Sequence, residues 1–124
     1  MKRVIATPDA PKAVGPYSQA IEVNGTLYIS GQIPVNPADG KIQEDIVDAA
    51  HQSLKNIGAI LKEAGMTYDN VVKTTVLLAD IADFKAVNEV YAEYFTGDKP
   101  ARACYQAAAL PLGVKVEIEA IAVR

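Results

Sequence analysis

Two periods organise the apolar residues of this chain. Segments in which apolar and polar residues alternate, or in which β-branched residues run together, predict β-strands, because successive side chains of a strand point to opposite faces. Longer segments in which apolar residues recur every three or four positions predict helices. The strands are expected at residues 2–6, 17–23, 26–32, 71–78, 100–106 and 114–123, and the helices from about 45 to 64 and from 80 or 83 to about 95.

Asn24-Gly25 predicts a two-residue β-turn between the second and third strands, since both residues tolerate a positive φ. This turn sets Ile21 opposite Tyr28, and the same register places Tyr17 and Ser30 on one face of the hairpin. A β-bulge just after Ser30 would disrupt that arrangement. From the pattern alone, Tyr17 and Ser30 are one packed aromatic residue and one hydroxyl at the end of a strand.

Both helices carry an apolar stripe, and the first also has clear end signals. Asp45 is an N-cap candidate, and Gly65 suits the left-handed residue of a Schellman motif. The second stripe includes one amide, Asn88, which needs hydrogen-bond partners if it is buried. Asn88 therefore either fixes a loop, which we favour, or reaches a site. The stripes are Val47, Ala50, Leu54, Ile57, Leu61 and Ala64 in the first helix, and Phe84, Val87, Asn88, Tyr91 and Phe95 in the second.

The order of these elements predicts an α+β fold with about six strands and two helices. Two helices can cover only one face of such a sheet. The other face would still carry apolar residues such as Tyr28, Ile121 and Val123, which are unusual on an open surface. We therefore expect that the chain is not a monomer and that another subunit covers this face.

The last quarter of the chain contains the residues that are best suited to form a binding or catalytic site. Period two places Arg102, the only cysteine, Cys104, and Gln106 on one strand face, and Glu117 with Glu119 on a face of the last strand. The turn at residues 110–113 suggests that the two strands are neighbours. One interpretation is an amphipathic hairpin with a solvated Arg–Glu pair. The other is a site in which the guanidinium binds a carboxylate or phosphate and a glutamate holds a water.

Composition limits the classes of function. The chain has 124 residues and a formal net charge of −3, with no basic patch that would indicate nucleic-acid binding. No apolar run reaches the roughly 20 residues of a membrane span, and the start lacks the apolar core of a signal peptide. A single cysteine cannot form an internal disulfide, which suits a cytoplasmic protein. His51, the only histidine, has no cysteine or histidine cluster around it in the sequence, so we expect no metal site.

Several motifs resemble those of the RidA family, also called YjgF, the reactive-intermediate deaminases. They are Gly15-Pro16-Tyr17-Ser18-Gln19-Ala20, Ser30-Gly31-Gln32-Ile33-Pro34, Pro100-Ala101-Arg102-Ala103-Cys104, Leu110-Pro111 and Val116-Glu117-Ile118-Glu119-Ala120-Ile121-Ala122. The resemblance covers essentially the whole chain, so residues 1–124 are expected to be one RidA-like domain. The sequence departs from the family pattern at residues 105–109 and at Leu112-Gly113.

The resemblance implies a chorismate-mutase-like fold and a homotrimer with ligand clefts between subunits. It also implies hydrolysis of 2-imino acids and their enamine tautomers, such as 2-iminobutanoate and 2-iminopropanoate, to 2-oxo acids and ammonia, with no cofactor or metal. In that activity Arg102 would clamp the substrate carboxylate, and Glu117 with the Cys104 carbonyl would place the water. The expected catalytic residues are Arg102, Glu117 and Cys104, and the expected substrate-binding residues are Tyr17, Ser30, Gly31, Asn88 and Arg102.

Other functions remain as alternatives at this point. A sensor that binds 2-oxo acids in the same clefts would also need Arg102, but would not need the Glu117 carboxylate. A role as an endoribonuclease or translation inhibitor fits poorly with the acidic balance and the lone histidine. A nucleophilic Cys104 has no histidine at a recognisable spacing.

Overall fold

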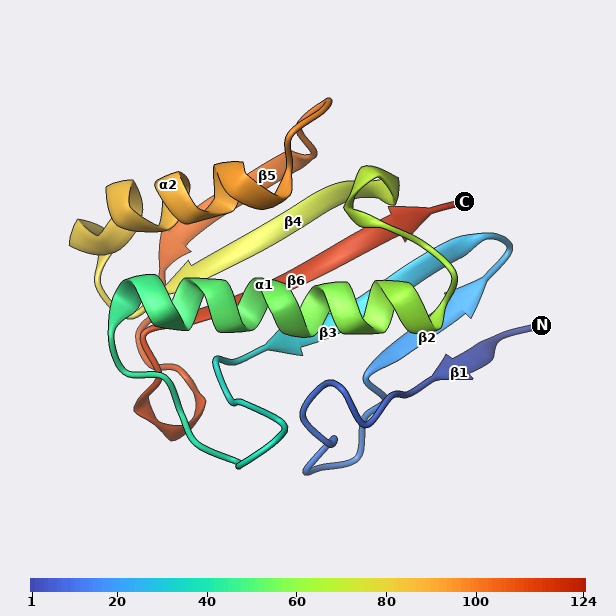
Figure 1. The fold of residues 1–124 in the computed structure, drawn as a ribbon, viewed down its shortest axis with the longest axis horizontal. Coiled ribbons are helices and arrows are strands. Elements are labelled where there is room, and N and C mark those ends of the chain that lie inside the picture. The colour runs from blue at the N-terminus through green and yellow to red at the C-terminus, as the bar shows by residue number, and fades with distance from the viewer.

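Six strands form one mixed sheet in the computed structural model, which describes residues 1–124 (Figure 1). The strand order is β1-β2-β3-β6-β4-β5, and every neighbouring pair is antiparallel except β4 and β5, which are parallel. Helix α2 is the crossover that parallel pairing requires. The elements are β1 (Arg3–Ile5), β2 (Ala20–Val23), β3 (Thr26–Gln32), α1 (Ile46–Glu63), β4 (Val71–Leu78), α2 (Phe84–Tyr94), β5 (Ala101–Gln106) and β6 (Val116–Val123), with 3-10 turns at Tyr68–Asn70, Ile81–Asp83 and Pro111–Gly113.

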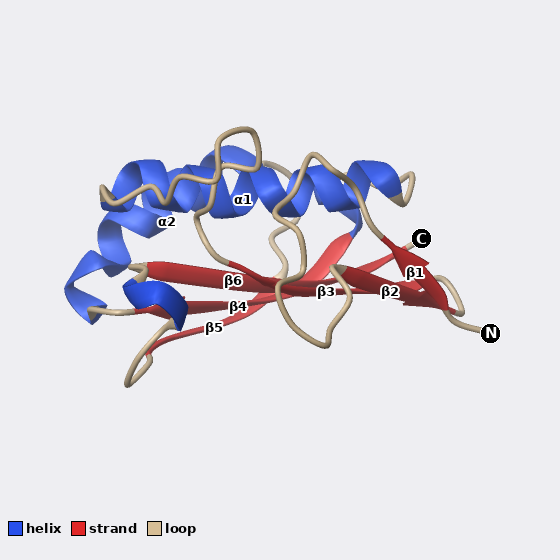
Figure 2. Cartoon of the chain, turned by 90° about the horizontal axis from the view of Figure 1, so that it is seen from below, coloured by secondary structure: helices blue, strands red, loops and turns tan.

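Both helices pack on the same face of the sheet, as Figure 2 shows from the side. Between the two layers lies one hydrophobic cluster of 24 buried residues. The α+β class, the six strands and the two helices on one face are thereby confirmed. Neither helix is long and apolar enough to pass through a bilayer.

The predicted hairpin register is confirmed, because Ile21 pairs with Tyr28 across β2 and β3. β2 begins at Ala20, however, and not at Tyr17. The preceding segment is held instead by the buried side chain of Gln19, which donates hydrogen bonds to the carbonyls of Thr7, Ala10 and Pro11. These long-range hydrogen bonds fix the loop between β1 and β2 at the end of the sheet.

The expected pairing between the strand of Arg102 and the strand of Glu117 is wrong. β6 is hydrogen-bonded to β3 on one side and to β4 on the other, so no position beside it is left for β5. β4 therefore separates the two strands, and the chain from residue 107 to 115 crosses over it instead of forming a hairpin.

The stripe of α1 is buried as predicted except at its start, where Val47 is 41% exposed. Full burial in α1 begins at Ala49, while Ile46 in the first turn is partly buried and packs against the core. In α2, Phe84 is likewise half-exposed, while Val90 is buried although it lies outside the predicted stripe.

The face of the sheet away from the helices carries exposed apolar side chains and is uncovered in one chain. Val4, Tyr28, Tyr105 and Val123 are exposed there, as the alternation along their strands requires. Apolar side chains in such number on an open sheet face are typical of an interface.

The end signals of α1 can be tested directly. The Asp45 carboxylate accepts hydrogen bonds from the backbone N–H groups of Val47 and Asp48, both at 3.1 Å. We expect Asp45→Ala to lower the free energy of unfolding by about 1 kcal/mol, because two N–H groups lose their acceptor. Asp45→Asn keeps an acceptor and is the matched control. Equal urea midpoints for wild type and Asp45→Ala would contradict the capping role.

Candidate active site

Four of the expected site residues line one pocket. Tyr17, Ser30, Gly31 and Glu117 surround a space of about 530 Å³, which we call the Glu117 pocket; its other lining residues are Val14, Ile33, Pro111, Leu112 and Glu119. Tyr17 comes from the loop that Gln19 anchors, and the serine and glycine come from the end of β3. Glu117 comes from the start of β6, the strand that pairs with β3.

A β-bulge joins these residues. The pairing of β3 with β6 shifts register between Ile29 and Gln32, so the irregularity that the sequence left open does occur at Ser30 and Gly31. The Ser30 hydroxyl donates to the Ser18 carbonyl at 2.6 Å, which holds the loop before β2 against the bulge. Tyr17 thus reaches the pocket of Ser30 even though it precedes the strand.

Gly31 makes room for the Glu117 carboxylate. A Cβ added to Gly31 would collide with Glu117 Oε2, and the next nearest atoms also belong to Glu117. The glycine therefore lets this carboxylate lie directly against the backbone of the bulge. Gly31, which is expected among the substrate-binding residues, therefore also determines where Glu117 lies.

Burial raises the pKa of Glu117 above its ordinary value, and the negative charge of Glu119 raises it further. Both glutamates lie on the uncovered face of β6, two residues apart. A carboxyl group whose pKa is raised accepts a proton more readily near neutral pH than an ordinary glutamate does.

The other expected residues gather around Arg102 on β5. Its Nη1 donates to Asn88 Oδ1 at 2.8 Å. Its guanidinium carbon lies 4.9 Å from the ring centre of Tyr91 and 5.5 Å from that of Phe84. We call Arg102, Asn88, Phe84 and Tyr91 the Arg102 cluster. Cation–π contacts of this kind restrict the guanidinium without using its N–H donors.

The charge of Arg102 has no counterion in the chain. No carboxylate oxygen lies within 4.0 Å of its guanidinium, whereas Arg3 and Arg124 both pair with Glu22. Of its five N–H donors, Arg102 uses one, on Asn88. A partly buried guanidinium with free donors is suited to bind a carboxylate through two parallel hydrogen bonds.

Asn88 differs from our favoured expectation, because it fixes no loop. Its only side-chain hydrogen bond is to Arg102, and this bond links α2 to β5. The amide oxygen orients the guanidinium, so Asn88 belongs to the Arg102 cluster.

Cys104 lies two residues beyond Arg102 and is half-buried. Burial raises the pKa of its thiol, and the positive charge of Arg102 only partly opposes that effect. A raised pKa keeps the thiol protonated at neutral pH and disfavours a thiolate nucleophile.

The backbone of Cys104 faces the edge of the sheet. β5 is the last strand, and the Ala107 N–H donates to the Leu78 carbonyl of β4 at 2.9 Å. Because backbone groups alternate in direction along a strand, Tyr105 also faces β4 and the Cys104 carbonyl points to the free edge. That carbonyl is available as an acceptor.

Arg102 and Glu117 lie on opposite faces of the sheet. Arg102 aligns with Thr74, which is buried under the helices, whereas Glu117 aligns with Leu77 on the other face. Residues aligned across strands share a face. Within one chain, the structure therefore brings Tyr17, Ser30, Gly31 and Glu117 together and Arg102, Asn88 and Cys104 together, but it does not join the two groups.

His51 belongs to neither group. Its Nδ1 is 2.7 Å from the Tyr94 hydroxyl, so it links α1 to α2. No group of three or more His, Cys, Asp or Glu side chains is arranged to hold a metal ion.

Some lining residues were not expected from the sequence. Val14, Ile33 and Leu112 are the apolar walls of the Glu117 pocket, and they come from three separate loops or strand ends. Glu119 could have been found, since it shares a strand face with Glu117 by period two. The aromatic partners of Arg102 were visible only as members of a helix stripe.

Comparison with known proteins identifies the family of this chain. The model of the family described as Endoribonuclease L-PSP matches residues 7–124, and the chain belongs to this family. The expected membership of the RidA family is thereby confirmed.

Individual relatives cover the whole chain. A mouse (Mus musculus) protein named 2-iminobutanoate/2-iminopropanoate deaminase is 58% identical over 100% of this chain and 93% of its own length. The structure of the YjgF gene product of E. coli has 46% identity and a TM-score of 0.96, with 98% of both chains covered. E. coli TdcF, solved with bound serine, has 45% identity and a TM-score of 0.96, again over 98% of each chain.

The electrostatics of the Glu117 pocket give a prediction. We expect carboxyl NMR titration to show a pKa for Glu117 above that of an ordinary glutamate, because the group is half-buried beside Glu119. Glu119→Gln should lower this pKa, since one of the two causes is removed. Glu44→Gln, on an exposed residue in another loop, is the control and should leave it unchanged. An ordinary or lowered pKa for Glu117 in the wild type would contradict the described environment.

Proposed function

We propose that this protein is an enzyme that hydrolyses reactive 2-imino acids, such as 2-iminobutanoate and 2-iminopropanoate and their enamine tautomers, to 2-oxo acids and ammonia. The observation that carries the proposal is the pair of complementary half-sites: an arginine with no counterion beside an edge carbonyl, and a carboxyl of raised pKa in a pocket. The name of the mouse relative supports it.

The reaction needs little from the protein, because a protonated imine is already electrophilic. Arg102 binds the substrate carboxylate with its free N–H donors, and the aromatic rings hold the guanidinium in place. Glu117 and the Cys104 carbonyl hold a water near the imine carbon. The water oxygen bonds to that carbon while the Glu117 carboxylate takes one of its protons.

The tetrahedral intermediate then collapses. Glu117 returns the proton to the nitrogen, and the C–N bond breaks as the carbon–oxygen double bond forms. The hydroxyl proton of the intermediate passes to the Glu117 carboxylate and then to the departing ammonia, which leaves as ammonium. One protonated imine and one water give one 2-oxo acid and one ammonium ion. Tyr17 and Ser30 shape the pocket, and Gly31 allows Glu117 to occupy its position.

Two copies of the chain contribute to each site. Arg102 and Glu117 lie on opposite faces of one sheet, so they can act on one substrate only when the Arg102 cluster of one copy meets the Glu117 pocket of another. The uncovered apolar face supplies the contact, and a homotrimer closes three equivalent clefts. A cytoplasmic location stays a prediction that rests on the single cysteine.

A sensor of 2-oxo acids would use the Arg102 cluster alone, so the raised pKa of Glu117 favours the enzyme. The family description also names an endoribonuclease. Histidine is the residue most often used for acid–base catalysis. The single histidine of this chain, His51, forms a hydrogen bond with Tyr94 between the helices and lines neither half-site. We therefore place the deaminase first.

Subunit complementation tests the shared site. Arg102→Ala should lower kcat/KM at least roughly a hundredfold, because two charge-assisted hydrogen bonds are lost. Glu117→Gln should be similarly impaired because it cannot take a proton. Mixed trimers of the two variants should recover about one quarter of wild-type activity, since a random cleft pairs the intact Arg102 of one copy with the intact Glu117 of another in that proportion. Imine loss is followed by semicarbazide trapping, and light scattering at micromolar concentration should give a trimer.

The matched control is the double variant Arg102→Ala/Glu117→Gln co-assembled with either single variant, which restores no complete cleft and should stay inactive. If the mixed single variants form trimers without regaining activity, the shared site is wrong. If Arg102→Ala keeps wild-type turnover, the clamp is wrong.

Cys104→Ala separates the thiol from the backbone. If only the carbonyl of residue 104 holds the water, this variant should retain activity within about threefold of the wild type, because alanine keeps the carbonyl and the thiol is protonated at neutral pH. A fall to the uncatalysed rate in an intact trimer would instead identify a thiolate nucleophile.

A further inference from the structure

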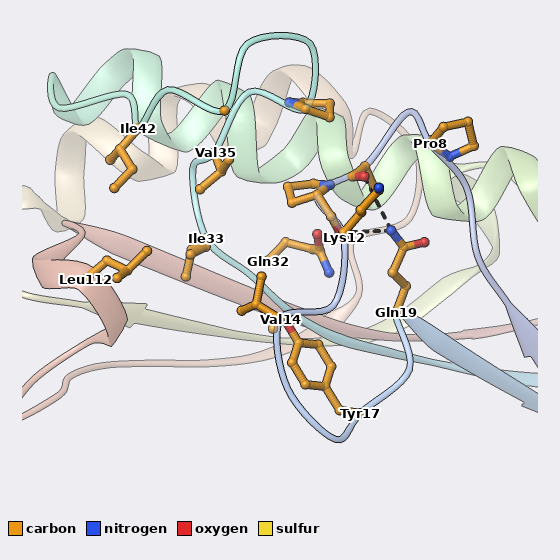
Figure 3. A pocket seen from close by; sticks show the side chains of 15 residues that line it. Pro8, Lys12, Val14, Tyr17, Gln19, Gln32, Ile33, Val35, Ile42 and Leu112 are labelled. Carbon is orange, nitrogen blue, oxygen red and sulfur yellow. Dashed lines mark hydrogen bonds between the residues drawn. The ribbon is translucent and has the colours of Figure 1, made fainter.

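A second pocket adjoins the Glu117 pocket. It has a volume of about 510 Å³ and lies between the segment of residues 8–14 and the segment of residues 33–42 (Figure 3). We call it the side pocket. Val14, Tyr17, Gly31, Ile33 and Leu112 line both pockets, so the two spaces are adjacent.

The side pocket is mostly apolar. Ile33, Val35 and Ile42 point into it from the chain that follows β3, and Pro8 and Val14 lie across from them (Figure 3). Val35 and Ile42 are held in position by an isolated β-bridge. A rigid aliphatic wall of this kind suits a carbon chain.

The polar groups on its walls are largely occupied. The Gln19 amide is used on the loop of residues 7–11, and the buried Gln32 donates to the Ser30 carbonyl at 3.0 Å. Gln32 Oε1 receives no hydrogen bond from the chain, and Lys12 is exposed at the rim. The pocket therefore suits a group that consists mainly of carbon and tolerates one hydrogen-bond donor.

An imino acid has three substituents on its reacting carbon. In the proposed function, Arg102 takes the carboxylate, and the nitrogen faces Glu117 with the attacking water. The third substituent, the side chain, needs a space of its own beside these groups, and Gly31 and Tyr17 line both the Glu117 pocket and the side pocket. Val14 and Leu112, which line both pockets, are 88% and 74% exposed, so apolar surface is available there for a ligand to cover.

We propose that the side pocket receives the side chain of the imino acid, and that Val35 and Ile42 set the length of aliphatic side chain that the enzyme accepts. This assignment rests on the proposed function for its chemistry, but the side pocket can also be tested by binding alone.

The experiment compares two substrates in variants that change only the side pocket. Val35 and Ile42 line the side pocket and not the Glu117 pocket. We expect Val35→Phe and Ile42→Phe to lower kcat/KM for the leucine-derived imine at least about tenfold, because one or two lost carbon-sized spaces have effects of this order. The value for the alanine-derived imine should change by less than about threefold. Val35→Ala, which widens the pocket, should raise the leucine-to-alanine ratio.

Val47→Phe is the matched control, since Val47 is exposed on α1 and lines neither pocket. Calorimetry with 2-oxopropanoate and 4-methyl-2-oxopentanoate measures the ratio of the two binding affinities, which reports on the side pocket without any turnover. If the phenylalanine variants fold and leave the ratio within about twofold of wild type, the assignment is wrong; if they fold poorly, an unchanged ratio in Val35→Ala overturns it.

The two proposals fail in distinguishable ways. A wild type that binds both 2-oxo acids but hydrolyses neither imine contradicts the deaminase, and the binding ratios of the variants still decide the side pocket. A wild type that hydrolyses both imines, with ratios unaffected by Val35 and Ile42, contradicts the side pocket alone.

Discussion

The position of β4 between β5 and β6 determines where the polar residues of this chain can act. β4 pairs in parallel with β5 through the α2 crossover, and antiparallel with β6. Residues aligned across neighbouring strands share a face. Arg102 therefore lies with Thr74 on the face under α2, and Glu117 lies with Leu77 on the open face. Each group is fixed by backbone hydrogen bonds and cannot swing to the other side. If both act on one substrate, two copies must contribute to each cleft, and the apolar open face then serves function as well as stability.

The two half-sites are prepared for opposite charges. Folding already restricts Arg102 through Asn88, Phe84 and Tyr91, so binding a carboxylate orders little further. Glu117 is prepared in the opposite sense, since burial and Glu119 disfavour its negative charge. A carboxylate held in this way gains from any positive charge placed beside it. The same surroundings that raise its pKa therefore also favour a cationic ligand.

Local signals in the sequence account for much of the fold but less of the site. Asn24-Gly25 fixes the β2–β3 register, and Asp45 and Gly65 mark the ends of α1, because these residues act on their immediate neighbours. Strand order is not local: nothing in residues 107–115 indicates that β4 intervenes, so Arg102 and Glu117 were expected side by side. The place of Tyr17 depends on Gln19 bonds to a distant loop, and the need for glycine at residue 31 depends on Glu117. Such dependence on tertiary contacts leaves no periodic pattern.

The charges of the proposed substrate match this division. A protonated 2-imino acid carries a negative carboxylate and a positive nitrogen on adjacent carbons. The Arg102 cluster offers a positive charge without a counterion, and the Glu117 pocket offers two acidic residues. If both halves were on one face, Arg102 and Glu117 would pair with each other and leave neither charge free. Placing them on opposite faces of the sheet prevents that internal ion pair. In the proposed homotrimer, a zwitterionic ligand would then lie between the Arg102 of one copy and the Glu117 of another.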